Sequence, residues 1–235
     1  MQKFHEGRVY SMQRPELIAI DLDGTLIDSA PDLAFAASEM LKRLGRAQVA
    51  EERVRDWIGN GADMLVKRAL TGEMVPEKNP VDFQRGLDVF SEIYADNVSV
   101  RSSLYDGVTE GLQRLQKAGF SLACLTNKHS RFTRPLMKRT GLGPYFDYVG
   151  CGDDFEQLKP HPSSLLKTAE RFNVAPARSL MVGDSVNDVQ AARAAGFQVF
   201  CVPYGYLNGL RVEDLNADLI IDSLADLPNV LENLH

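Results

Sequence analysis

The sequence predicts an α/β protein in which a doubly wound parallel sheet carries an inserted α-helical cap domain. Strand-like apolar runs alternate with helical patterns from about residue 105 to residue 202, which is typical of parallel sheets. Residues 17–20 read LIAI, an unbroken apolar run of the kind that a strand buried on both faces requires. Residues 29–100 instead show helical periodicity and no strand pattern, so we expect an all-helical insertion just after the first strand.

Four helices are expected within this insertion. Ser29 and Pro31 favour the start of the first helix, and Gly45 ends it. Gly59-Asn60-Gly61 separates the second helix from the third, and Gly72 closes the third. The expected helices cover residues 31–44, 51–58, 62–70 and 81–97.

The rest of the chain alternates strands with helices. Strands are expected at residues 120–125, 148–149, 180–182, 197–202 and 219–221, and helices at 108–118, 129–139, 163–172 and 186–195. We therefore expect a discontinuous core domain of residues 1–28 and 101–235, and a cap domain of residues 29–100. Because the insertion follows the first strand, it lies over the carboxyl edge of the sheet, where a helical lid can open and close.

Length and composition are those of an ordinary globular protein. The chain has 235 residues, of which 44% are hydrophobic and 25% charged, enough for one large core or a core with a smaller domain. A net charge of −6 gives no reason to expect a nucleic-acid partner, and no apolar run approaches the ~20 residues of a membrane span. We expect a cytoplasmic protein, a monomer or a homodimer. The first residues form a polar lead-in without a signal segment, and translation starts at Met1 or Met12.

The cysteine pattern excludes two other classes. Cys124, Cys151 and Cys201 form an odd, widely spaced set, which argues against a disulfide framework. A cysteine-dependent phosphatase needs five residues between its cysteine and an arginine, whereas six separate Cys124 from Arg131. We expect Cys124 and Cys201 to be small core residues.

Two carboxylates follow the first strand. Asp21 and Asp23 lie where a parallel strand reaches the ligand-binding edge of a sheet, and Gly24 allows a tight turn after them. Adjacent anions repel unless a cation or a shared proton neutralises them. This favours a nucleophile and an acid/base group beside a divalent metal. A solvated polar turn is the alternative explanation.

Later segments bring further polar groups to the same edge. Thr126 and Asn127 follow the next long strand, and their hydroxyl and backbone N–H groups suit phosphate oxygens, although N-capping of the next helix explains them too. Lys159 lies between Leu158 and Pro160, ahead of a helix, and a lysine is a strong point charge for phosphate. An ordinary surface lysine is the alternative.

A last pair of carboxylates follows an apolar strand. Asp184 is expected to emerge where Asp21 does and to complete a Mg²⁺ site of hard oxygen ligands. Asp188, one helical turn later, is expected to orient Lys159 or Ser185, or else to be a first-turn aspartate favoured by the helix dipole. Ser185 as the nucleophile of a serine hydrolase would need a histidine base, and no histidine lies in a suitable pattern.

These motifs, in this order, resemble the haloacid dehalogenase (HAD) superfamily. The match runs from about residue 17 to residue 202 and implies a HAD-like Rossmannoid core with an α-helical cap. Asp23 indicates a phosphatase branch, because the haloacid dehalogenases themselves carry an aromatic residue there and use no metal. Shorter segments resemble bacterial phosphoglycolate phosphatases, namely residues 57–61, 65–70, Thr126-Asn127-Lys128 and residues 202–206.

The resemblance implies a phosphoric monoester hydrolase. Asp21 would attack phosphorus to form an aspartyl-phosphate, and Asp23 would protonate the leaving group and then activate water. Mg²⁺ would be held by Asp21, Asp184 and the backbone carbonyl of Asp23. Thr126, Asn127 and Lys159 would bind the phosphate.

The resemblance indicates the substrate less directly than it indicates the reaction. Asn60 and Arg68, on the lid, are candidates for binding a substrate carboxylate, with a loop residue and a solvated arginine as the alternatives. We expect 2-phosphoglycolate, and a sugar phosphate or N-acetylmuramic acid 6-phosphate as the alternative. A phospho-accepting receiver domain also clusters aspartates on a doubly wound sheet, but receivers are shorter, carry no helical insertion and place the acceptor aspartate after a later strand.

Overall fold

β1 (Leu17–Ile20) lies in the middle of a six-stranded parallel sheet with the strand order β5-β4-β1-β6-β7-β8. The computed structural model describes residues 12–234, so the expected lead-in, except for its last residues, lies outside the described residues. Each strand of the sheet begins and ends within one residue of its expected position. The other strands are β4 (Ser121–Leu125), β5 (Tyr148–Gly150), β6 (Ser179–Gly183), β7 (Gln198–Cys201) and β8 (Leu219–Ile220).

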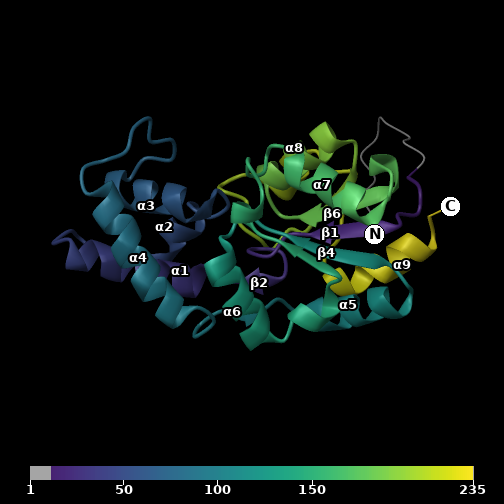
Figure 1. Cartoon of the computed structure of the whole chain (residues 1–235), viewed down its shortest axis with the longest axis horizontal. Helices are drawn as coiled ribbons and strands as arrows, with labels where there is room; N and C mark the ends of the chain where they lie inside the picture. The colour runs from purple at the N-terminus through teal and green to yellow at the C-terminus, as the bar shows by residue number, and fades with distance from the viewer. Residues whose placement is uncertain (1–11, 235) are drawn as a thin grey trace.

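Helices cover both faces of this sheet, which explains the unbroken apolar run of β1. Ile18 and Ile20 pack into a core with α5 (Val108–Lys117), α6 (Ser130–Thr140) and α9 (Leu227–Glu232). Leu17 and Ala19 face the opposite core, with α7 (Ser163–Phe172) and α8 (Val186–Ala195). Figure 1 shows α7 and α8 above the sheet and α5 and α9 below it. The predicted doubly wound architecture is confirmed.

The inserted helices pack on one another beside the sheet. α1 (Ala30–Arg43) contacts α2 (Glu51–Arg55), α3 (Gly61–Thr71) and α4 (Phe83–Asn97), and α3 contacts α4. Together they form the left-hand part of the molecule in Figure 1. The division into a core of residues 1–28 and 101–235 and a cap of residues 29–100 stays a prediction.

Two of these helices differ from their expected ranges by more than one residue. α4 was expected from residue 81 but begins at Phe83, because Asp82 adopts a left-handed φ of 67° that a helix does not allow. α2 was expected to reach residue 58 but ends at Arg55, and the chain turns before Gly59, whose φ is 120°.

A short antiparallel ribbon connects the inserted helices to the core. β2 (Ile27–Asp28) pairs with β3 (Ser103–Leu104), and neither strand was expected from the sequence. The carboxylate of Asp32, fully buried in the first turn of α1, accepts hydrogen bonds from the backbone N–H groups of the incoming chain at 2.9–3.1 Å; the donors are Val100, Arg101 and Ser102. The two chain crossings are therefore held side by side.

A second cluster of hydrogen bonds secures the same crossing from the core. The Tyr206 hydroxyl accepts from the backbone N–H groups of Ser29 and Ala30, at 2.8 and 2.9 Å, and donates to Asp28 Oδ1 at 2.8 Å. Arg55 of α2 donates to both carboxylate oxygens of Asp28, at 3.0 and 2.8 Å. Asp28 thus connects a helix of the insertion with a tyrosine of the core.

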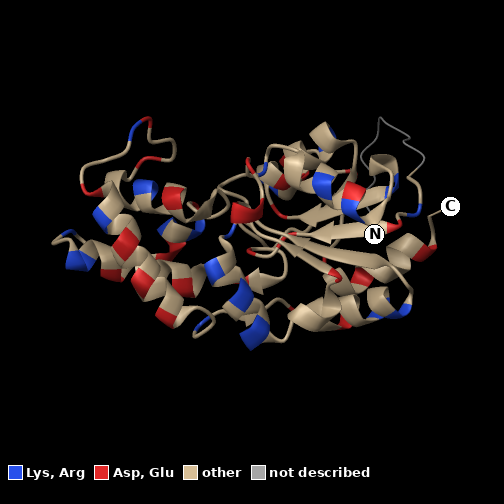
Figure 2. Ribbon diagram, viewed as in Figure 1, with Lys and Arg blue, Asp and Glu red and all other residues tan. Residues whose placement is uncertain are grey.

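Charged side chains are mixed over the molecule. Figure 2 shows Lys and Arg interspersed with Asp and Glu along the helices of the insertion and around the sheet. α6 is the exception, because its charged residues are all basic: Arg131, Arg134, Lys138 and Arg139. Across residues 12–234, no helix is both long enough and apolar enough to span a membrane.

Candidate active site

The turn after β1 places two carboxylates at the carboxyl edge of the sheet. The Asp21 N–H donates to Val182 of β6 at 2.9 Å, so the β1 backbone stays in register up to Asp21. The chain then turns at Gly24, which has a φ of 91° and whose N–H donates to Ile27 at 2.9 Å. A Cβ at Gly24 would lie 2.2 Å from Asp184 Oδ2, so both the backbone angle and the space require glycine.

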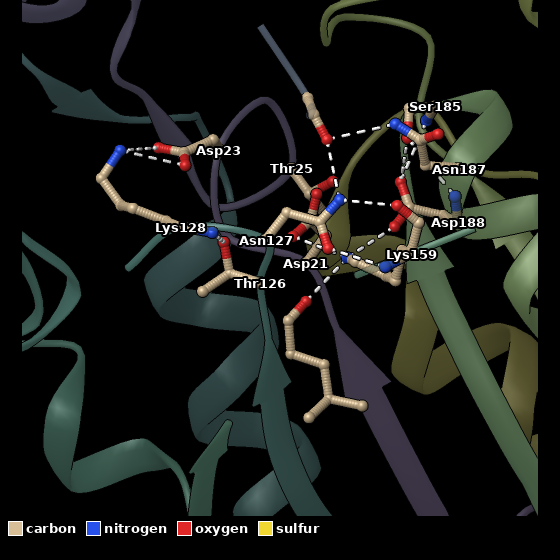
Figure 3. A network of polar contacts seen from close by, with 12 residues as sticks. Asp21, Asp23, Thr25, Thr126, Asn127, Lys128, Lys159, Ser185, Asn187 and Asp188 are labelled. Atoms are coloured by element: carbon tan, nitrogen blue, oxygen red, sulfur yellow. Dashed lines mark hydrogen bonds and ion pairs between the residues drawn. The ribbon is translucent and has the colours of Figure 1, made fainter. Parts of the chain in front are cut away.

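Lys159 is fixed between two carboxylates. Its ammonium lies 2.9 Å from Asp21 Oδ1 and 2.7 Å from Asp188 Oδ1, and it donates to the Leu125 carbonyl at 2.7 Å. Burial alone would lower the pKa of Lys159, but the charges of Asp188 and Asp21 outweigh burial and raise it. Lys159 is therefore a buried ammonium with its charge directed at Asp21, as Figure 3 shows.

Asp188 supports this lysine from α8. Besides Lys159, it accepts from the Ser185 hydroxyl at 2.6 Å and from the Ser185 N–H at 3.1 Å, in a capping box at the start of the helix. Both contacts expected for Asp188 are thus present. The Ser185 hydroxyl donates to Asp188 and not to a histidine base.

Asp184 completes a group of three carboxylates. One oxygen each of Asp21, Asp184 and Asp188 lie within 4.8 Å of one another. Asp184 accepts from the Thr25 hydroxyl at 2.7 Å and from the Tyr206 N–H at 2.6 Å, and burial, followed by the charges of Asp188 and Asp21, raises its pKa well above its usual value. No lysine or arginine among residues 12–234 forms an ion pair with it.

This arrangement fits a magnesium ion. The donors are hard carboxylate oxygens, which Mg²⁺ prefers, and the 1% exposed Asp184 lacks a protein cation to offset its charge. A Cβ at Gly205 would lie 2.3 Å from Asp184 Oδ2, so glycine backbone lines this side of the carboxylate. Asp188 is already engaged by Lys159 and Ser185, which leaves Asp21 and Asp184 as the better ligands.

The segment after β4 contributes Thr126, Asn127 and Lys128 to the site. The Thr126 N–H donates to Gly150, and the Thr126 hydroxyl accepts from the Lys128 N–H at 3.1 Å. The Asn127 side chain fixes the backbone of Lys159, accepting from its N–H at 2.9 Å and donating to its carbonyl at 2.8 Å. Asn127 therefore positions the lysine, while Thr126 lines the same pocket as Asp21.

The turn between α2 and α3 closes over this edge. The Gly59 carbonyl accepts from two core amides, Asn127 Nδ2 at 2.9 Å and Asn187 Nδ2 at 3.1 Å. The pocket beneath it is lined by polar residues of the core and by an apolar wall, made of Leu33, Ile58, Ala62, Leu65, Phe90 and Tyr94 of the insertion with Phe132 of α6. The helical insertion therefore covers the site in this conformation.

The two residues expected to bind a substrate carboxylate do not line this pocket. Arg68 is 7% exposed and donates to the carbonyls of Met74 and Trp57 and to Asn60 Oδ1, at 2.9, 2.6 and 2.9 Å. The Asn60 amide nitrogen donates to Asn187 at 3.4 Å. Arg68 thus holds the turn between α2 and α3 together, and its expected contact with a substrate has no support in this arrangement.

Comparison with known proteins identifies the family. The family model of haloacid dehalogenase-like hydrolases matches residues 15–196. This chain belongs to that family. The predicted superfamily and the predicted class, a hydrolase, are confirmed.

Curated relatives of this HAD-like hydrolase cover almost its whole length. It is 46% identical over 220 residues to a phosphoglycolate phosphatase of Nitrosococcus oceani, covering 94% of this chain and 98% of the relative. It is 49% identical to a phosphoglycolate phosphatase of Thiobacillus denitrificans, over 89% of this chain and 92% of the relative. A crystal structure described as a predicted phosphoglycolate phosphatase from Haemophilus somnus superimposes with a TM-score of 0.86 at 34% identity, over 93% of this chain and 99% of that one.

One residue of the HAD-like hydrolase's site was not predicted as a functional residue. Lys128 donates to both carboxylate oxygens of Asp23, at 2.9 and 3.0 Å, and Figure 3 shows this pair apart from the Lys159 cluster. Burial would lower the pKa of Lys128, but Asp23 and Tyr94 outweigh burial and raise it. The Thr126-Asn127-Lys128 triplet was visible in the sequence, but the partner of a lysine is decided by the fold.

Proposed function

We propose that this HAD-like hydrolase is a Mg²⁺-dependent phosphatase that converts 2-phosphoglycolate to glycolate and phosphate through an aspartyl-phosphate. The observation that carries this proposal is the position of Asp21, whose carboxylate meets the ammonium of Lys159 at 2.9 Å beside Asp184 in a covered pocket. Curated relatives at 40–49% identity are phosphoglycolate phosphatases, which supports the substrate.

Asp21 serves as the nucleophile of the first step. Its carboxylate oxygen forms a bond to phosphorus while the bond from phosphorus to the ester oxygen breaks, and that oxygen leaves with the electron pair. Lys159 and the Thr126 hydroxyl bind the oxygens of the transferring phosphoryl group. Catalysis of this transfer relies mainly on positioning and on cations near the developing charge.

Asp23 serves as the acid and then as the base. It gives a proton to the leaving oxygen, which releases glycolate. It then takes a proton from water, whose oxygen attacks phosphorus while the bond between Asp21 and phosphorus breaks. Phosphate leaves, and both aspartates return to their starting states. Ser29, whose hydroxyl donates to Asp23 Oδ1 at 2.5 Å, and Lys128 hold Asp23 in position.

Asp21, Asp184 and the Asp23 backbone carbonyl would hold Mg²⁺. When bound, the ion offsets the repulsion between the Asp21 carboxylate and the phosphate dianion. Asp188 stays with Lys159 and Ser185, where it keeps the lysine directed at Asp21.

The pocket wall favours a small substrate over a sugar phosphate. Leu33, Ile58, Leu65 and Phe90 offer no hydrogen-bond partners to the hydroxyl groups of a sugar. A two-carbon phosphate ester needs contacts only at its phosphate and its carboxylate. The same wall argues against an aminosugar phosphate such as N-acetylmuramic acid 6-phosphate.

A panel of phosphate esters tests the proposal. Purified protein with Mg²⁺ is assayed for phosphate release from 2-phosphoglycolate, glucose 6-phosphate, ribose 5-phosphate and N-acetylmuramic acid 6-phosphate. The highest kcat/KM is expected for 2-phosphoglycolate. A higher value for any sugar phosphate would overturn the substrate assignment, and release of at most one phosphate per chain would replace the enzyme by a phospho-accepting receiver.

A further inference from the structure

We infer that Lys128 and the hydroxyl group of Tyr94 form the binding site for the substrate's carboxylate. The inference rests on the proposed function and deepens it, because it places the carboxylate-selecting cation on the core and not on Arg68 of the insertion. The site would admit short phosphate esters that carry a carboxylate one carbon beyond the ester oxygen.

Lys128 is a buried cation on the wall of the pocket. It is 7% exposed, and its ammonium lies 4.9 Å from the centroid of the Tyr94 ring. Asp23, at 2.9 Å, is the carboxylate with which it pairs. A cation in such an apolar setting attracts an anion more strongly than a solvated lysine does, because little water screens the charge.

Tyr94 supplies an independent observation. Its side chain is 1% exposed and lines the pocket, and its hydroxyl group lies beside the Lys128 ammonium without a well-aligned hydrogen bond to any described residue. A buried hydroxyl without a well-aligned partner destabilises the folded state, so such groups usually meet a ligand or water. A carboxylate oxygen beside Lys128 would accept this hydrogen bond.

Lys128 is itself paired with Asp23, but the other basic side chains near the pocket either have more partners, lie outside it or are half exposed. Lys159 is held by Asp21, Asp188 and a backbone carbonyl. All three nitrogens of the Arg68 guanidinium donate within the insertion, and the residue does not line the pocket. His129 lines it, but half of its side chain is exposed and it faces Asp153 at 3.3 Å.

The position of Lys128 relative to Asp23 fits the substrate. In the proposed reaction Asp23 contacts the ester oxygen, and in 2-phosphoglycolate the carboxylate carbon lies two bonds from that oxygen. An ammonium within hydrogen-bond distance of Asp23 is therefore also within reach of the carboxylate. The phosphate, in contrast, is bound on the far side of the ester oxygen by Lys159, as the separation of the two lysines in Figure 3 illustrates.

The test compares two esters that differ only in the carboxylate. Ethyl phosphate has the carbon chain of 2-phosphoglycolate with a methyl group in place of the carboxylate. For Lys128→Met, kcat/KM is expected to fall about 10- to 100-fold further on 2-phosphoglycolate than on ethyl phosphate, the worth of a charge-assisted contact. Any loss common to both esters reflects the contact of Lys128 with Asp23. Lys128→Arg, which keeps the charge, should recover part of the difference.

Tyr94→Phe provides a second measurement that does not depend on the first variant folding. It removes one oxygen and keeps the ring, and kcat/KM on 2-phosphoglycolate is expected to fall about 3- to 10-fold with little change on ethyl phosphate. Lys67→Met is the matched control, because Lys67 also lies over an aromatic ring, Phe83 at 5.1 Å, but outside the pocket. This variant should leave kcat/KM on both esters unchanged.

Each outcome bears on one proposal. Equal losses on the two esters, in both Lys128→Met and Tyr94→Phe, would overturn the carboxylate site and leave Lys128 as a positioning residue for Asp23. A failure of the proposed function is seen separately, in the assay of the unmodified protein on the two esters. If that protein hydrolyses ethyl phosphate as well as 2-phosphoglycolate, no carboxylate is recognised at all.

Discussion

Asp21 illustrates how competing charges act on one residue. Burial raises its pKa to about 7, with Asp188 and Asp23 adding to the effect, while Lys159 opposes it. A nucleophilic carboxylate must be ionised, so at neutral pH it benefits from a further positive charge. The proposed Mg²⁺ ligand set, Asp21 with Asp184, would provide that charge at the right place.

Replacement of Asp21 tests its role most directly. Asp21→Asn keeps the volume but removes the proposed nucleophile and a proposed metal ligand, so phosphate release from 2-phosphoglycolate should fall below detection. The melting temperature should stay near that of the unmodified protein, because Lys159 keeps Asp188 as its partner. Residual activity within about tenfold of the unmodified enzyme would remove Asp21 from its assigned role, since a lost nucleophile costs far more.

The lowered pKa of Asp28 leads us to expect that the stability of the protein depends on pH. Burial would raise the pKa of this carboxyl, but hydrogen bonds from Arg55 and Tyr206 outweigh burial and lower it. The folded-state value therefore lies below the unfolded value of 3.8, so the stabilisation is present above about pH 4 and is lost as the pH falls through the folded-state value.

Urea unfolding of Asp28→Asn at several pH values measures this effect. The variant should be about 1 kcal/mol less stable than the unmodified protein near pH 7, with the difference shrinking below about pH 4. Glu77→Gln, at an exposed loop position, is the control and should show no such difference. A difference that grows on acidification would contradict the assigned sign.

At the scale of elements, Arg68 of α3 determines how the turn at Gly59 is held. Arg68→Met would leave the buried carbonyl of Trp57 and the partly buried carbonyl of Met74 without this donor, and the free energy of unfolding should fall by about 2–4 kcal/mol. The ratio of kcat/KM on 2-phosphoglycolate to that on ethyl phosphate should stay unchanged. Arg85→Met, an exposed arginine of α4, serves as the control for stability. A selective loss on 2-phosphoglycolate would restore Arg68 as a substrate-binding residue.

The elements that the sequence predicted well are those with a local cause. The apolar runs of β1 and β6 and the glycines after α3 and α6 act within a few residues. The sequence pattern therefore predicts where these strands lie and where these helices end. β2 and β3 escaped prediction because each has two residues and exists only by pairing with a segment far along the chain. α9, with six residues, is too short for a helical period to show.

The same reasoning separates the predicted from the missed site residues. Asp21, Asp184 and Lys159 follow strands or precede a helix, so the topology of a parallel sheet brings them together. The partners of Arg68 and Lys128, by contrast, come from how the insertion lies on the core, which no local pattern encodes. A lysine beside Asn127 was visible in the sequence, but its pairing with Asp23 was not.

For the whole molecule, the proposed Mg²⁺ site links the stability of the protein to its activity. Excess chelator should abolish turnover, and Mg²⁺ or Mn²⁺ should restore it. Ca²⁺ should inhibit, because it accepts more oxygen ligands at longer distances and would hold Asp21 out of line for attack. Mg²⁺ at about 100 times its Kd should also raise the free energy of unfolding by about 2.7 kcal/mol. Asp184→Asn is the control and should lose both responses; full activity in chelator would exclude the metal.

The β2–β3 ribbon has a consequence for how such a protein can change over evolutionary time. Because Asp28 and Ser103 are paired residues, the chain departs from the sheet and returns to it at adjacent points. Lengthening or shortening the intervening segment alters the closure entropy only slowly and leaves the strand order untouched. A descendant gene can therefore exchange one insertion for another, and with it the helical side of the pocket, while inheriting the polar residues at the carboxyl edge of the sheet.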